Sequence, residues 1–350
     1  MTIGTENTKV EMAPVAPRGF LDGSKFTHVR PPRPMLARDA DSIYWMARYV
    51  ERAEHIARVL KVNAALLTDV GELAPSLHER QWQSILQIFD APKPPDGDLP
   101  ISVRTHRLMC FSEENHNSIV SCIVNARENA RGVRENISAE MFEHLNMLYW
   151  FVRSEDAKLE LEESSEEFFK TIMNGSMLFQ GLCTQTLPHE QPWLFTQLAK
   201  YLERIDITCR IIETKFSILR GAETILETPL RNIHWMAVLR SCCSIEAFRR
   251  LHLGDMDPLR VAAFMILERD YPRSVRFSVD RALGAAAEIR SSVGKSGVDP
   301  AERVLGRLKA QLEFAEMDEI LVDGLPAYLK KIRAQVGDAS LAIAKAYFLH

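Results

Sequence analysis

Apolar residues recur at helical spacing along almost the whole chain from residue 35 onward. In the first such stretch, Trp45, Tyr49 and Leu60 fall on one broad apolar face when residues are placed about 100° apart. This pattern predicts an unbroken helix over about 42–68. Runs with a period of two, typical of strands, are almost absent, so the sequence predicts an all-α fold. Further helices are expected over 76–90, 101–110, 113–136, 138–153, 157–182, 190–220, 231–251, 257–268, 272–292, 299–322 and 325–347.

The first 34 residues differ from the rest of the chain. They are rich in proline, glycine and charge, end in Arg30-Pro-Pro-Arg-Pro34 and show no apolar period. Such a segment buries too little apolar surface to offset the entropy of ordering, so 1–34 is expected to be a disordered extension. The remaining residues, 35–350, are expected to form one large helical bundle.

A repeat divides this bundle. The stretch from Trp45 to Arg58 aligns without gaps with Gln197 to Arg210, and the offset is a constant 152 residues. Both copies read Tyr-(Val/Leu)-Glu-Arg-x-(Glu/Asp)-x-x-x-Arg. Six matches in fixed register exceed what chance supplies. The sequence therefore predicts two related helical halves that face each other, with the repeat helices near 42–68 and 190–220.

The charged positions of the repeat allow two interpretations. Taken alone, Glu54 and Arg58 are typical of a solvated helix face with an i,i+4 ion pair. In the second copy, however, Ile207 and Ile211 lie close to Glu203 around the helix, which is typical of a buried helix. Buried charges must be paired. The charged stripe is expected either to hold two helices in register or to line a polar cavity.

Two other segments add arginines. Arg131 and Arg134 share one side of a predicted helix, whereas Arg273 and Arg276 lie in the first turn of another. Cations are unfavourable at the positive end of a helix unless a carboxylate such as Glu268, or a bound anion, receives them. We expect an anion-binding pocket between the halves. Its candidate residues are Arg52, Arg204, Arg131, Arg134, Arg273, Arg276, Glu54 and Asp206.

Composition narrows the function further. A formal net charge of −4 provides no general field for nucleic acid or anionic lipid. The six cysteines form no CxxC pair and are expected to be reduced. No segment approaches about 18 consecutive apolar residues. A cytoplasmic protein without a membrane span is therefore expected. The sequence contains no glycine-rich nucleotide-binding loop, no GxSxG motif of serine hydrolases and no HExxH zinc motif. The segment Glu113-x-x-His116 is only half of a di-iron signature. No cofactor and no metal are expected.

Four segments carry a resemblance to a known family. The stretch Met35–Glu54 resembles the opening signature of the alpha-E family, and 126–131, 239–249 and 271–277 resemble three further blocks in the same order. The resemblance implies a bacterial, all-helical protein. Such proteins are commonly encoded beside a circularly permuted ATP-grasp protein and a transglutaminase-like protease, which implies a role in making or modifying a peptide.

Two functions follow as hypotheses. The first is an accessory binding or assembly module for the ATP-grasp partner, with the transglutaminase-like protease as a possible second partner. In this hypothesis a pocket lined by glutamate and arginine receives an anionic ligand. The alternative is an enzyme in which Glu51 and Glu203 act as general acid and base on a peptide or amino acid. The lack of a recognisable nucleophile or cofactor loop favours the first.

Overall fold

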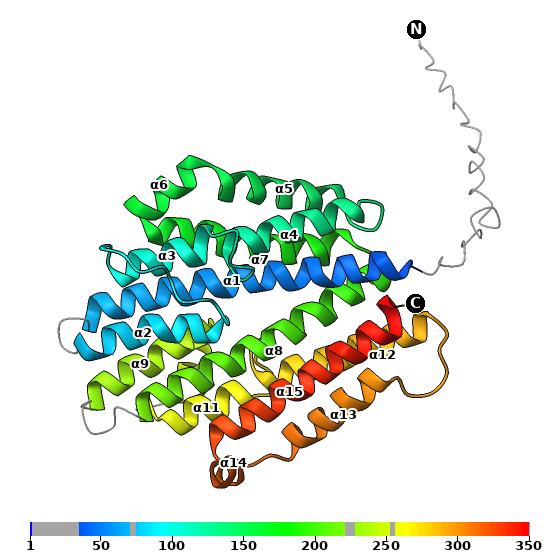
Figure 1. The fold of residues 1–350 in the computed structure, drawn as a ribbon. Coiled ribbons are helices and arrows are strands. Elements are labelled where there is room, and N and C mark those ends of the chain that lie inside the picture. Colours follow the sequence, from blue (N-terminus) through cyan, green and yellow to red (C-terminus); the bar gives the residue numbers. More distant parts are fainter. Residues whose placement is uncertain (2–34, 71–74, 221–227, 253–255, 350) are drawn as a thin grey trace. The chain divides into compact units, whose positions relative to one another are not determined.

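The computed structural model describes residues 1, 35–70, 75–220, 228–252 and 256–349. Within these ranges the chain forms fifteen α-helices and no strand (Figure 1), so the predicted all-α fold is confirmed. Residues Met35–His350 form one compact unit. The expected extension over 1–34 lies outside the described residues, apart from Met1.

Short connections join the helices along the chain. Their bounds are α1 (Ala37–Val70), α2 (Pro75–Ile88), α3 (Ile101–Phe111), α4 (Ile119–Gly132), α5 (Ala139–Arg153), α6 (Glu155–Glu163), α7 (Ser165–Thr186), α8 (Gln191–Arg220), α9 (Thr228–Ser241), α10 (Ile245–Leu251), α11 (Pro258–Leu267), α12 (Val275–Ser292), α13 (Pro300–Glu313), α14 (Met317–Asp323) and α15 (Leu325–Ile343), followed by a π-helical turn, η2 (Ala344–Phe348). Within the described ranges, no helix combines the length and the apolar character needed to cross a bilayer.

Some expected helices are broken in two. The stretch 231–251 was expected as one helix, but α9 and α10 are separated at Cys243, whose φ is 57°. A positive φ in a non-glycine residue ends a right-handed helix. The stretch 299–322 is likewise divided into α13 and α14. The apolar period continues through these short breaks, and periodicity alone does not reveal them.

The helices pack as two halves with the same succession. In the first half α1 packs on α4 and α7, α4 packs on α5, and α5 packs on α7. In the second half α8 packs on α12 and α15, α12 packs on α13, and α13 packs on α15. The two repeat helices, α1 and α8, also pack on each other near the middle of the bundle (Figure 1). The duplication therefore extends beyond the short sequence repeat.

The loops that precede α4 and α12 show the same duplication in detail. Ser118 caps α4, and its hydroxyl donates to the carbonyl of Ser112 at 2.7 Å. Ser274 caps α12 in the same way and donates to the carbonyl of Glu268 at 2.5 Å. Each serine also accepts from the backbone N–H three residues later. This cap explains why the helix expected over 113–136 begins only after Ser118.

One apolar core runs through both halves. Large side chains from α2, α7, α9 and α10 are buried in it, among them Trp82, Phe179, Trp235 and Phe248. Of the charged residues of the repeat motif, Glu51, Glu54, Arg58, Glu203 and Arg204 are buried in this core, and Arg52, Asp206 and Arg210 are half-buried. Burying a charge costs free energy, so each buried charge needs a partner of opposite charge.

Candidate functional site

The two repeat helices exchange glutamate–arginine pairs. Arg52 of α1 donates from Nε to Glu203 Oε1 of α8 at 2.6 Å. Arg204 of α8 donates from Nε to Glu51 Oε1 of α1 at 2.7 Å. Both glutamates are 1% exposed. Glu51-Arg52 and Glu203-Arg204 occupy equivalent positions of the repeat. The arginine of each dipeptide therefore pairs with the glutamate of the other dipeptide.

A tyrosine supports each of these arginines. The Arg52 guanidinium lies 5.8 Å from the centre of the Tyr49 ring, and that of Arg204 lies 5.5 Å from the centre of the Tyr201 ring. A guanidinium over an aromatic face is held by cation–π attraction. The arginine follows the tyrosine at position i+3 in both copies, which places the two side chains on the same side of the helix. The repeated Tyr-x-Glu-Arg thus has a physical basis: tyrosine orients the arginine that crosses to the opposite glutamate.

Glu203 receives a second arginine. Arg48 donates from Nε to Glu203 Oε2 at 2.7 Å, so both carboxylate oxygens are paired. Arg52 also donates from Nη1 to Asn117 Oδ1 at 2.9 Å. Arg48 was not among the residues expected at the site. A signal was present, because the repeat has a basic residue at this position in both copies, Arg48 and Lys200.

Glu54 is paired with arginines from two elements. Arg273, in the loop before α12, donates to both oxygens of Glu54 at 3.1 Å, and Arg58 donates to Glu54 from one turn along α1. The equivalent acid of the second copy, Asp206, accepts from Arg210 at 2.8 Å and from Arg333 at 3.1 Å. The carboxylate of Glu54 therefore neutralises Arg273.

The arginines keep these buried carboxylates ionised. Burial raises the pKa of a carboxyl group, but Arg52 and Arg48 outweigh that effect and lower the pKa of Glu203 to about 2. Burial is likewise outweighed at Glu54, where Arg273 is the main cause of a pKa of about 2. Arg204 lowers the pKa of Glu51 well below its usual value against the effect of burial. A general acid needs a pKa near the working pH, so these groups are poorly suited to acid–base catalysis at neutral pH.

Positive charge exceeds negative charge in this centre. Three glutamates, Glu51, Glu54 and Glu203, face Arg48, Arg52, Arg58, Arg204, Arg273 and Lys200. Lys200 is 8% exposed and donates to the Gln197 side chain, and no carboxylate of the described residues lies within ion-pairing distance of it. Burial and the neighbouring Arg204 lower the pKa of Lys200 to about 8. Among the described residues, the carboxylates of this centre therefore do not balance its cations.

Glu51, Glu54 and His55 bring three possible metal-ligand atoms close together. Their ligand atoms lie within 4.8 Å of one another, and all three side chains are buried. The carboxylates already accept from Arg204, Arg58 and Arg273. A divalent cation would have to displace guanidinium groups and would add charge to a cation-rich region. These residues do not suit a metal ion.

Three of the expected arginines lie away from the network. Arg131 is exposed and pairs with Glu128 at 3.3 Å, and Arg134 lies over the ring of Phe142. Arg276 lines a separate hollow of about 260 Å³ on the outer side of α12. The structure thus brings Arg52, Arg204 and Arg273 together with the glutamates but leaves Arg131, Arg134 and Arg276 outside. Helical position alone does not say which neighbouring helix a side chain meets.

A second buried polar cluster lies where α8 packs on α2 and α9. The ammonium group of Lys215 donates to the side chains of Gln81 and Ser84, and Gln81 Nε2 lies 3.3 Å from His234 Nδ1. Lys215 is 4% exposed, and burial lowers its pKa to about 7. Sequence reasoning missed this cluster. The repeat held a signal, since the counterpart of Lys215 is Asn63, a second polar residue at a buried position.

Replacing Lys215 with methionine is expected to stabilise the protein at pH 7 by about 1 kcal/mol or more, because a buried amine with neutral partners is replaced by an apolar chain of similar length. The destabilising contribution of this amine should also diminish between pH 7 and pH 10. In that range Lys215 of the unfolded chain, with a lysine pKa of about 10.4, binds more protons than Lys215 of the folded chain. Urea unfolding at pH 7 and pH 9.5 measures the difference in stability between the variant and the wild type at each pH, with exposed Lys330→Met as control.

The stability advantage of the methionine variant over the wild type should be smaller at pH 9.5 than at pH 7. A Lys215→Met protein that is less stable than the wild type at pH 7, with the same pH dependence as the wild type, would contradict this interpretation of the cluster.

Comparison with known proteins shows distant relatives. This chain is 23% identical over 323 residues to the uncharacterized proteins Mb2597 of Mycobacterium bovis and Rv2567 of Mycobacterium tuberculosis. The alignment covers 85% of this chain but only 35% of each relative. No solved structure shows significant similarity to this chain.

A family profile matches nearly the whole chain, over residues 35–348. It describes a predicted alpha-helical domain with a conserved ER motif. Two Glu-Arg dipeptides of this chain, 51–52 and 203–204, are the pairs that α1 and α8 exchange. The fold and the extent of the match agree, and the protein belongs to the Alpha-E family.

Proposed function

We propose that this protein is a non-catalytic binding and assembly module, which works with a circularly permuted ATP-grasp protein in making or modifying a peptide. Its cation-rich centre receives an anionic group, such as a peptide carboxylate or a phosphate. The observation that carries the proposal is the charge of the centre, where Lys200 has no carboxylate partner among the described residues. The ionised state of Glu51 and Glu203 argues against the alternative role as general acid and base.

In each relative the region similar to this chain is 35% of a longer protein. The ATP-grasp partner and a possible transglutaminase-like protease follow from the family resemblance alone. We place the protein in the cytoplasm, where its six free cysteines remain reduced and ATP is available to the partner.

Isothermal titration of the full chain with the circularly permuted ATP-grasp protein of the same genome tests the assembly role. We expect saturable binding with a dissociation constant in the micromolar range or below, as for specific protein complexes. The second arm measures thermal stability in inorganic phosphate. Phosphate should raise the melting temperature of the wild type and have less effect on Lys200→Met.

Exposed Lys330→Met is the matched control, since it removes the same charge outside the centre. Absence of binding heat together with absence of co-elution of the two proteins would refute the assembly role. An equal response of wild type and Lys200→Met to phosphate would refute the anion site.

A further inference from the structure

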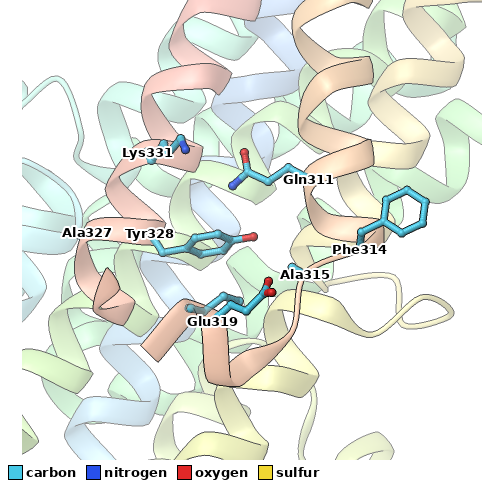
Figure 2. Close-up of a pocket in the computed structure, with 8 residues that line it drawn as sticks. Gln311, Phe314, Ala315, Glu319, Ala327, Tyr328 and Lys331 are labelled. Atoms are coloured by element: carbon cyan, nitrogen blue, oxygen red, sulfur yellow. The ribbon is translucent and has the colours of Figure 1, made fainter. Parts of the chain in front are cut away.

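A hollow of about 520 Å³ lies between α13, α14 and the start of α15. Gln311, Phe314, Glu319, Ile320, Tyr328 and Lys331 line it. In Figure 2 the Tyr328 hydroxyl, the Gln311 amide and the Glu319 carboxylate turn toward the same space, whereas the Phe314 ring points away from it. The hollow lies apart from the glutamate–arginine centre and uses none of its residues.

The first half of the protein shows how the same position can be filled. Helices α5 and α7 correspond to α13 and α15 at an offset of 160 residues, and the buried positions coincide along both pairs. Phe151 and Phe168 occupy the positions of Gln311 and Tyr328. Their rings stack at 5.8 Å with an interplanar angle of 28°, and Phe168 is fully buried. The hollow is therefore a property of the side chains of the second half and not of the shared topology.

Polar groups in the hollow lack partners. The Tyr328 hydroxyl is shielded from solvent and lies beside Gln311 without reaching hydrogen-bonding geometry with any described residue. Gln335 donates to Gln311 Oε1 at 3.4 Å, but its own Oε1 also has no partner among the described residues. Buried polar groups in proteins are nearly always satisfied by protein, water or ligand. The phenol of Tyr328, which has no partner among the described residues and stands at a position that holds a phenylalanine in the first half, points to a ligand with a hydrogen-bonding group.

Charges of both signs flank these groups. Glu319 and Lys331 are exposed, and within the described residues neither forms an ion pair. The Phe314 ring beside the opening is 80% exposed and points away from the hollow. From this combination we propose that the hollow binds a zwitterionic ligand of amino-acid or short-peptide type. Glu319 meets the ammonium group, Lys331 meets the carboxylate, and Tyr328 with Gln311 binds the amide. The site does not depend on the proposed function or on the ATP-grasp partner.

The dipeptide alanyl-phenylalanine is the probe, and saturation-transfer NMR on the full chain measures its affinity. The wild type should bind it, and the same dipeptide with an acetylated N-terminus and an amidated C-terminus should bind at least about tenfold more weakly, because both charge pairs are lost. Lys331→Glu should weaken binding of the free dipeptide by about tenfold or more. Lys330→Glu makes the same charge change on the adjacent exposed residue outside the hollow and should have no effect.

A second variant fills the hollow. Gln311→Phe combined with Tyr328→Phe copies the stacked pair of the first half and should remove binding while keeping the wild-type circular dichroism spectrum. Three results would overturn the proposal. They are no binding of the free dipeptide to the wild type, equal binding of the free and blocked dipeptides, and wild-type affinity in the filled variant with native circular dichroism.

Discussion

Replacing Arg204 with methionine is expected to lower the free energy of unfolding by about 3–5 kcal/mol, the cost of leaving a buried charge without its partner. Among the described residues, Arg204 is the only arginine that donates to Glu51, which is 1% exposed and otherwise has His55 Nε2 at 3.3 Å. Methionine keeps much of the side-chain length, so the loss reports the charge more than the packing. Urea unfolding at pH 7 measures the change.

The repeat supplies a matched comparison. Arg52→Met removes the equivalent residue of the first copy, but Glu203 keeps its second arginine, Arg48, so the expected loss is smaller. Arg131→Met, on an exposed side chain, should change stability by no more than about 0.5 kcal/mol. If Arg204→Met and Arg131→Met had the same small effect, the exchanged pairs would not hold the halves together.

Acid is expected to destabilise the protein strongly between about pH 4.5 and pH 2. The folded-state pKa values of Glu203 and Glu54 are lowered from 4.5 to about 2. Their stabilising contribution is therefore complete above pH 4.5 and is lost as the pH falls through the folded-state values. At about 1.4 kcal/mol per pKa unit, each glutamate accounts for about 3 kcal/mol across this range. Urea unfolding at pH 5, 4 and 3 measures the slope.

Glu203→Gln tests which groups produce that slope. The variant should be less stable than the wild type at pH 7, because it leaves Arg48 and Arg52 without a carboxylate. It should also lose less stability on acidification, because one of the titrating groups has been removed. Wild-type stability that stays constant from pH 5 to pH 3, or an unchanged slope in the variant, would show that the network does not stabilise the fold.

The sequence supported the all-helical fold and the meeting of the repeat helices for physical reasons. Helical periodicity is strong over long amphipathic segments, and the apolar residues Ile207 and Ile211 around Glu203 indicated that the charged stripe is buried. Once buried, those charges required partners, and the nearest available partners were the same residues of the other copy. The structure places Glu51 and Glu203 in that interface.

Other features depend on contacts that one helix does not reveal. Arg131 and Arg276 were expected in the anion-binding pocket, yet Arg131 is exposed and Arg276 lines a separate hollow. The partners of Lys215 lie on α2, and the sequence of α8 does not reveal which helix packs there.

The reciprocal exchange between Glu51-Arg52 and Glu203-Arg204 is the arrangement of an isologous dimer whose two subunits have become one chain. In a symmetric dimer every substitution appears twice, and both copies of a surface must serve the same purpose. Joining the copies removes that constraint. The first half has a stacked phenylalanine pair at two positions. The second half has a tyrosine and a glutamine at the same positions, and these two side chains line a hollow. The shared centre keeps the halves together, and asymmetry at the periphery becomes compatible with a stable fold.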